Sequence, residues 1–318
     1  MRECRVSGPI TVEIMTVTVL VPDDEGVTAL SELDGVLAVR YTLGEPLPAD
    51  AVKAEVLIPG LGAHTVTDAL FAELPNLRLI QLLSAGAEDW IGSVPDGVLL
   101  STCRGAHGGS TAEWVVAVLL SMYRELPAFT ADLAGQRWER RMTGTLQGKR
   151  ALVVGAGDLG RQLRRRLEAF DTRVTLVGMS ARDGVRGVEE LPDLLGGFDI
   201  VALMVPLTSR TRGMVDAAFL AAMKTGAILV NAARGSVVDT DALVAELRTG
   251  RLRAALDVTD PEPLPPGHPL WTVPGLVLTP HVGGTVDGAR GRSYAVAVSE
   301  IGRYAGGELP NNLVRGEY

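Results

Sequence analysis

The chain has 318 residues, 47% of them hydrophobic, and a formal net charge of −8 at pH 7. This length suggests about two domains at the usual ~150 residues each. The acidic balance argues against a general nucleic-acid binder, which needs a clustered basic face, and no apolar run approaches the ~18 residues of a membrane span.

The cysteines, Cys4 and Cys103, lie far apart and match no redox or zinc-binding spacing, so we expect reduced thiols and no metal site. The first fourteen residues carry Glu3 and Glu13 and lack the apolar segment of a signal peptide. We therefore expect a cytoplasmic protein.

The N-terminal part alternates predicted strands, at residues 16–22, 56–59 and 77–83, with a helix at 65–74. This pattern indicates a smaller α/β domain. The last strand ends in small residues, Ala85 and Gly86 among them. Their backbone N–H groups can bind a carboxylate, but from this segment alone we favour a plain turn.

A long apolar-periodic stretch, residues 111–133, predicts a helix that crosses between domains. We expect Thr111 to cap its N-terminus and Pro127 to break or kink it.

Residues 150–161 combine a predicted strand with glycines in the order Gly155, Gly157 and Gly160, and residues 162–170 continue as a helix. The spacing is that of a dinucleotide-binding turn. The first glycine permits the turn, the second lets a pyrophosphate approach the backbone, and the third allows close helix packing. A second strand at 173–177 strengthens this interpretation.

Further strands and helices follow in alternation, which predicts a parallel, doubly wound sheet. The strands are expected at 200–205, 227–230, 254–258 and 276–278, and the helices at 217–223, 240–249 and 293–305.

Chemically versatile side chains occur at the ends of predicted strands, namely Arg234, Glu262 and His281. An arginine can bind a carboxylate through two N–H groups, and a histidine can transfer a proton. Taken singly, each has an ordinary alternative as a solvated or structural residue. We assign the remaining histidines, His64, His107 and His268, to that ordinary class.

In combination these features resemble the D-2-hydroxyacid dehydrogenase family, from about Val56 onward. The motifs that carry the resemblance are Gly155-Ala-Gly-Asp-Leu-Gly160, Val205-Pro-Leu-Thr208 with Thr211, Asn231-Ala-Ala-Arg-Gly235, Asp257-Val258 with Glu262-Pro263, His268-Pro-Leu-Trp271 and Thr279-Pro-His281.

The resemblance implies that His281 is the general acid and base, with Glu262 as its partner, and that Arg234 binds the substrate carboxylate and carbonyl oxygen. Asp257 matches the acid that family members direct at the nicotinamide carboxamide. The implied substrate contacts are Ala85, Gly86, Arg234 and His281. The implied cofactor contacts are Gly155, Gly157, Asp158, Leu159, Gly160, Ser180, Arg182, Pro206, Thr211, Ala232, Arg234, Asp257, His281 and Gly283.

The family fold implies two Rossmann-like, doubly wound parallel-sheet α/β domains with an interdomain cleft. The substrate domain, which is flavodoxin-like, would comprise residues 1–112 and 292–318, and the dinucleotide domain residues 113–291. The resemblance also implies a homodimer, in which Trp138 would reach the neighbouring subunit's active site.

Gly178 stands at the end of the second strand, where an NAD-specific enzyme carries an acid that binds the ribose hydroxyls. Without that acid a 2′-phosphate is not repelled, and Ser180 and Arg182 are available to bind it. We expect a preference for NADP, with NAD use as the alternative.

The expected substrate is a small 2-oxo acid such as glyoxylate or hydroxypyruvate. We expect no C-terminal regulatory domain, because residues 311–318 are too short for one, and this expectation disfavours an allosteric phosphoglycerate dehydrogenase. A competing hypothesis is a dinucleotide-sensing, corepressor-like protein, because such relatives retain Arg234, Glu262 and His281. Turnover distinguishes the two.

Overall fold

A computed structural model describes residues 16–60 and 68–316. Cys4, His64 and the first residues of the helix expected at 65–74 lie outside this range. The described residues form two compact units. The first contains those of Met1–Leu83, Asp89–Thr102 and Ala297–Leu313, and the second those of Ser84–Glu88, Cys103–Val296 and Val314–Tyr318.

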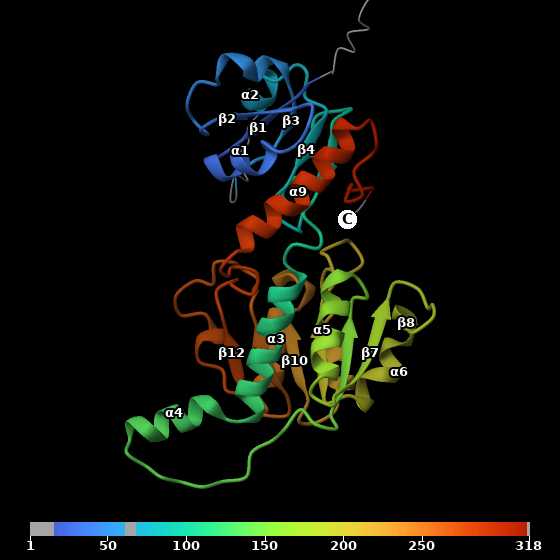
Figure 1. The fold of residues 1–318 in the computed structure, drawn as a ribbon. Helices are drawn as coiled ribbons and strands as arrows, with labels where there is room; N and C mark the ends of the chain where they lie inside the picture. Colours follow the sequence, from blue (N-terminus) through green and yellow to red (C-terminus); the bar gives the residue numbers. More distant parts are fainter. Residues whose placement is uncertain (1–15, 61–67, 317–318) are drawn as a thin grey trace, which may run out of the picture. The chain divides into compact units, whose positions relative to one another are not determined.

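The first unit is built on a five-stranded parallel sheet in the order β2-β1-β3-β4-β5, which is the flavodoxin-like order (Figure 1). Its strands are β1 (Val17–Val21), β2 (Val36–Arg40), β3 (Ala54–Leu57), β4 (Leu79–Gln81) and β5 (Leu99–Ser101). Its helices include α1 (Asp24–Leu30) and α2 (Asp68–Ala72). The sequence patterns did not predict β2, β5 or α1.

The second unit is built on a seven-stranded parallel sheet in the order β12-β11-β10-β9-β6-β7-β8. Its strands are β6 (Arg150–Val154), β7 (Arg173–Gly178), β8 (Val185–Gly187), β9 (Ile200–Leu203), β10 (Ile228–Asn231), β11 (Arg253–Leu256) and β12 (Leu276–Leu278). The strand order reverses between β6 and β9, and such a switch point is where doubly wound sheets bind ligands.

Helices cover both faces of this sheet. Its α-helices are α3 (Gly108–Tyr123), α4 (Leu126–Ala134), α5 (Asp158–Glu168), α6 (Leu191–Leu194), α7 (Ala217–Ala222) and α8 (Thr240–Arg248), and α9 (Ala289–Ala305) begins in this unit. Alternate residues of β6 enter different cores: Leu152 and Val154 pack with α6, α7 and α8, whereas Ala151 and Val153 pack with α3 and α5. The fold class expected from the sequence, two parallel-sheet α/β domains, is confirmed.

The turn after β6 requires glycine at two positions. Gly155 has φ of 120°, and a Cβ there would overlap the carbonyl group of Met204, directly after β9. A Cβ at Gly160 would overlap the carbonyl of Gly155. At Gly157, by contrast, a Cβ would meet no atom within 4 Å. The glycine turn therefore packs across the β6–β9 switch point while its middle glycine faces open space.

The helix expected at 111–133 is interrupted. It begins earlier, at Gly108, with His107 as N-cap, so the prediction that Thr111 caps it is wrong. The interruption falls at Glu125, which has φ of 53°. Pro127 then stands in the first turn of α4, where the missing N–H costs no hydrogen bond.

The other predicted elements are present, with ends that differ by a few residues. The largest shifts are at α5, which begins at Asp158 because Gly157 already serves as its N-cap, and at α9, which begins at Ala289 rather than Ser293. Within the described residues, no helix combines the length and apolar character needed to cross a membrane.

Candidate functional site

His281 and Glu262 form a close pair. Nδ1 of His281 lies 2.6 Å from Oε1 of Glu262, and their side chains are 48% and 40% exposed. His281 stands three residues beyond the end of β12 and has φ of 54°. Because the carboxylate engages Nδ1, Nε2 is the ring nitrogen left for another partner.

Asp257 organises the loop that carries His281. It directly follows β11 and is 4% exposed. Its Oδ1 accepts hydrogen bonds from the hydroxyl of Thr279 at 2.6 Å and from the N–H of Val282 at 2.9 Å, and its Oδ2 accepts from the N–H of Gly283 at 2.8 Å. The N–H of His281 donates to the backbone oxygen of Asp257 at 2.7 Å. These four bonds hold the proton-transfer candidate in its left-handed conformation.

Arg234 follows β10 in a turn that Asn231 shapes. The side-chain oxygen of Asn231 accepts from the N–H of Ala233 at 3.0 Å, and its amide donates to the backbone oxygen of Arg234 at 2.9 Å. The next residue, Gly235, lies so close to the carbonyl of Thr259 that a Cβ would overlap it. The loops after β10 and β11 are thereby packed together.

The guanidinium of Arg234 binds a residue that sequence reasoning missed. Glu88 lies 3.0 Å from its Nε through Oε1 and 3.3 Å from its Nη2 through Oε2. A Cβ at Gly86 would overlap both Nη2 of Arg234 and Oε2 of Glu88. The predicted Ala85-Gly86 segment and Arg234 therefore lie together, with a carboxylate beside them. Glu88 is the last residue of the segment 84–88, but no pattern near it in the sequence indicates Arg234 as its partner.

These groups come from neighbouring strands. In the sheet, β11 lies between β10 and β12, and parallel strands are spaced about 4.8 Å apart. Within the described chain, no hydrogen bond or ion pair joins Arg234 to His281 or Glu262. The guanidinium and the imidazole therefore stem from strands roughly 10 Å apart, at the edge where α/β sheets bind ligands.

The glycine turn has the features of a dinucleotide cradle. Gly157 is the N-cap of α5, and as a glycine it has no side chain to accept a hydrogen bond from the N–H groups of the first turn. Such a helix start attracts phosphate oxygens. With the open space at Gly157, the residues fit a dinucleotide.

The neighbouring predicted cofactor contacts lie around this turn. Asp158 directs its carboxylate at Gly108, at the start of α3, since a Cβ on Gly108 would overlap Oδ2. Thr211 donates to the backbone oxygen of Pro206 at 2.7 Å and so fixes the loop after β9. Leu159 is half-buried and Ala232 is buried.

Arg182 covers the position where NAD-specific enzymes carry an acid. A Cβ on Gly178 would come within 2.9 Å of Nη1 of Arg182, and that atom also lies 3.5 Å from the backbone oxygen of Ser180. A cavity of about 400 Å³ begins here. Four arginines line it, namely Arg161, Arg164, Arg165 and Arg182.

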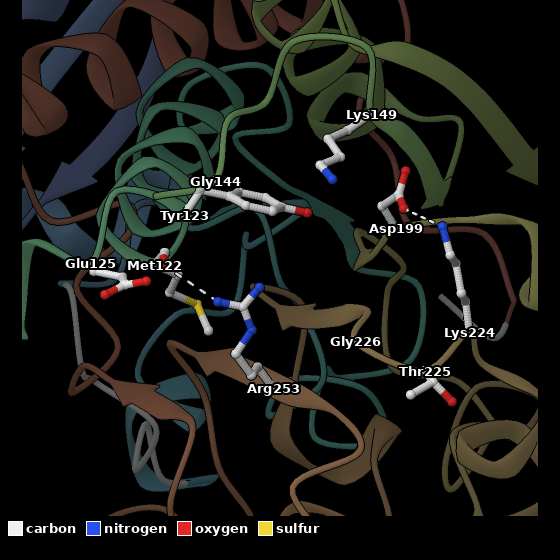
Figure 2. Close-up of a pocket in the computed structure, with 10 residues that line it drawn as sticks. All are labelled: Met122, Tyr123, Glu125, Gly144, Lys149, Asp199, Lys224, Thr225, Gly226 and Arg253. Atoms are coloured by element: carbon white, nitrogen blue, oxygen red, sulfur yellow. Dashed lines mark hydrogen bonds and ion pairs between the residues drawn. The ribbon is translucent and has the colours of Figure 1, made fainter. Parts of the chain in front are cut away.

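A second cavity, of about 390 Å³, lies away from the predicted residues (Figure 2). It opens among the amino ends of β6, β9, β10 and β11, where Lys224 binds Asp199 at 2.7 Å beside Tyr123. Burial raises the pKa of Tyr123 to about 12. Because ligands bind at the carboxyl ends of parallel strands, this cavity is not the predicted active site.

The other described histidines contact structural groups. Nε2 of His107 lies 3.1 Å from the hydroxyl of Ser293, and Nδ1 of His268 accepts from the N–H of Leu270 at 3.2 Å. Cys103 is buried, and its thiol donates to the backbone oxygen of Ser293 at 3.1 Å.

Comparisons with known proteins match this chain to members of one family. A family model described as D-isomer specific 2-hydroxyacid dehydrogenase, NAD binding domain, matches residues 116–283. A glyoxylate reductase of Thermofilum pendens is 34% identical over 271 residues, which are 79% of this chain and 80% of that protein.

A D-3-phosphoglycerate dehydrogenase of Methanocaldococcus jannaschii is 31% identical over 314 residues and covers 94% of this chain. The chain spans 59% of that relative's length. A solved structure of a D-isomer specific 2-hydroxyacid dehydrogenase from Xanthobacter autotrophicus Py2, in complex with NADPH and MES, has a TM-score of 0.82 and 29% identity. It covers 95% of this chain and 98% of that chain.

We predict that Asp257→Asn loosens the loop that carries His281, because an amide nitrogen replaces an oxygen that accepts a backbone hydrogen bond. An unsatisfied buried group of this kind costs about 1–3 kcal/mol. Hydrogen exchange at the amides of Val282 and Gly283 should accelerate, while exchange within α5 serves as the internal control. Unchanged exchange at both loop amides would contradict this role.

Proposed function

Because the chain belongs to the D-isomer specific 2-hydroxyacid dehydrogenase family, we propose that it reduces a small 2-oxo acid to the D-2-hydroxy acid. The observation that carries the proposal is the 2.6 Å pair of His281 and Glu262 on the same sheet edge as Arg234. A reduced nicotinamide dinucleotide, held by the Gly155–Gly160 turn, supplies the hydride.

In this proposal His281 is the proton donor. Its Nδ1 is engaged by Glu262, so Nε2 gives the proton to the carbonyl oxygen as that oxygen gains negative charge. The Glu262 carboxylate orients the ring and stabilises the imidazolium form. In the reverse direction the neutral ring accepts the proton from the hydroxyl group. The half-exposed imidazole can exchange that proton with solvent.

Arg234 and the Ala85-Gly86 segment bind the substrate in this proposal. The closeness of Gly86 to the guanidinium supports a shared carboxylate site, formed by backbone N–H groups and a cation. The same guanidinium stabilises the developing charge on the carbonyl oxygen.

For the substrate we propose glyoxylate or hydroxypyruvate, since the Thermofilum pendens relative is a glyoxylate reductase. The test follows NADPH absorbance with glyoxylate, hydroxypyruvate, pyruvate, phenylpyruvate and phosphohydroxypyruvate. Oxidation by glyoxylate or hydroxypyruvate is expected. Tight NADPH binding without oxidation by any of them would replace this proposal with the dinucleotide-sensing alternative.

For the cofactor we propose that NADPH is preferred and that NADH is the weaker alternative. The guanidinium over Gly178 supports this preference, because a 2′-phosphate binds such a group. The cavity beside it is lined by four arginines and two acids, Glu168 and Asp183, so cations outnumber carboxylates there. The NADPH complex of the Xanthobacter autotrophicus structure is consistent with it.

We also propose that the protein is a homodimer that pairs through α4 and the residues after it. All nine residues Leu126–Ala134 are described, and none is buried. Arg141 braces the returning chain, since it lies 2.8 Å from Asp132 and 2.8 Å from Glu125. The hydrogen bond from Arg141 lowers the pKa of Asp132. The cytoplasmic location expected from the sequence stays a prediction.

This braced arm extends from the second unit (Figure 1). It exposes large apolar side chains. Trp138 and Met142 are 98% and 96% exposed, and Leu133 is 77% exposed. Exposed apolar clusters of this kind mark protein interfaces. The expected contact of Trp138 with a neighbouring active site stays a prediction.

We predict that His281→Ala lowers kcat for glyoxylate reduction by ~10²-fold or more, because the proton donor is lost. The dissociation constant for NADPH, measured by fluorescence titration, should stay nearly unchanged. His268→Ala is the matched control and should retain kcat. An unchanged kcat in His281→Ala would refute the assignment.

We predict that Arg182→Ala raises KM for NADPH by ~10-fold or more while KM for NADH changes little, because only the 2′-phosphate loses a charge-assisted contact. Arg186→Ala, which removes a cation paired with Glu190 at 3.0 Å, is the control. Equal losses for both cofactors would remove Arg182 from the 2′-phosphate site.

We predict that Leu133→Asp weakens dimerisation, because a charge would be buried at the interface. Sedimentation equilibrium should show a dimer for the natural chain and a larger monomer fraction for the variant. Leu309→Asp, at another exposed leucine, should remain dimeric. A monomeric natural chain at micromolar concentration would overturn the proposal.

A further inference from the structure

Glu88 holds the guanidinium that the proposed function assigns to the substrate. Its oxygens lie 3.0 Å from Nε and 3.3 Å from Nη2 of Arg234, on one edge of the guanidinium group. The side chains of Arg234 and Glu88 are 34% and 21% exposed, so water competes only partly for this pair. The Nη2–Oε2 contact is a hydrogen bond, and the Nε–Oε1 contact is an ion pair without hydrogen-bond geometry. Together they hold one edge of the guanidinium against the carboxylate.

A third contact also restrains the guanidinium of Arg234. Nη1 of Arg234 donates to the backbone oxygen of Ala233 at 2.7 Å. One N–H of Nη1 and one N–H of Nη2 donate in these hydrogen bonds, so each terminal nitrogen keeps one N–H for another partner. The free N–H groups therefore have a fixed direction before any substrate arrives.

The backbone of Gly86 packs directly against this ion pair. A Cβ on Gly86 would overlap both Nη2 of Arg234 and Oε2 of Glu88. Glu88 and Gly86 belong to one short segment, Ser84–Glu88, in which the hydroxyl of Ser84 donates to the backbone oxygen of Gly86 at 2.8 Å. The segment that offers backbone N–H groups to a carboxylate is thus tied to the arginine by its own acid.

An ordinary exposed ion pair contributes little to stability and needs no functional explanation. The Glu88–Arg234 pair differs from such a pair in the segments that it joins. It connects two segments 146 residues apart in sequence, and both are assigned to the same substrate carboxylate. The negative charge of Glu88 also lies beside the proposed site of a substrate anion and repels that anion. A residue that only stabilised the fold would not need to lie there.

We propose that Glu88 is the positioning residue for Arg234. It orients the guanidinium so that the two remaining N–H groups of Arg234 point toward the carboxylate and carbonyl oxygens of the substrate. This inference rests on the proposed function. Glu88 itself touches no reacting atom. Its effect on catalysis passes entirely through the guanidinium, because a misplaced donor loses the alignment on which rate depends.

The test compares Glu88→Ala and Glu88→Gln in steady-state reduction of glyoxylate with saturating NADPH. Glu88→Ala should raise KM for glyoxylate by ~10-fold or more and lower kcat, because Arg234 becomes mobile. Glu88→Gln, which keeps one acceptor oxygen, should fall between Glu88→Ala and the natural chain. The dissociation constant for NADPH and the melting temperature should stay nearly unchanged in both variants.

Two comparisons make the result specific. Glu246→Gln breaks an ion pair of similar burial, in which Glu246 lies 2.6 Å from Arg251, and should leave KM unchanged. In an Arg234→Ala background, Glu88→Ala should produce no further loss, as expected for a residue that acts through the arginine. A full additional loss in the double variant would overturn the positioning role.

Other outcomes are equally decisive. A lower KM in Glu88→Ala would show that Glu88 competes with the substrate for Arg234, and an unchanged KM and kcat would show that the pair is structural only. Either result overturns the inference. If none of the tested 2-oxo acids makes the natural chain oxidise NADPH, or if Arg234→Ala retains full activity, the proposed function itself fails.

Discussion

The carboxylate of Asp257 is the constraint on which the proposed active site depends. It is nearly fully buried, and it accepts hydrogen bonds from Thr279, Val282 and Gly283. A buried carboxylate is unfavourable unless such donors surround it, so the loop after β12 has to close on it. Closure sets the backbone of His281 at φ of 54° and brings Nδ1 to Glu262. Both Asp257 oxygens are engaged in this way, and its implied contact with the nicotinamide carboxamide stays a prediction.

At the neighbouring strand ends, each side chain that is proposed to bind the substrate is paired with an acidic residue. Glu262 binds the imidazole of His281, and Glu88 binds the guanidinium of Arg234. In each pair the acid occupies one side of its partner and leaves the other side available. Such support holds donors in place before the substrate binds, which is how preorganised sites stabilise developing charge.

Local patterns allowed much of the fold to be predicted. The glycine turn, the strand ends that carry Arg234 and His281, and the parallel sheets all follow from short-range sequence features, and the fold class is confirmed. The family resemblance is likewise confirmed. The roles assigned to individual residues stay predictions, since no comparison tests them.

The errors and omissions have physical reasons. Thr111 matches a capping residue, but the preceding Gly108 and Gly109 already adopt helical geometry after His107. Strand β2 was not predicted although four of its five residues are apolar, because so short an apolar run does not distinguish a strand from a helix. Glu88 went unrecognised because its partner lies 146 residues away, a proximity that only the folded sheet creates.

Transfer of a labelled hydride tests the central claim most directly. The purified protein is incubated with NADPH that carries deuterium at the transferable C4 position, together with hydroxypyruvate, and the product is analysed by mass spectrometry and chiral chromatography. The account predicts a D-2-hydroxy acid with one deuterium at C2. Product without deuterium at C2, product of the L configuration, or no product at all would contradict it.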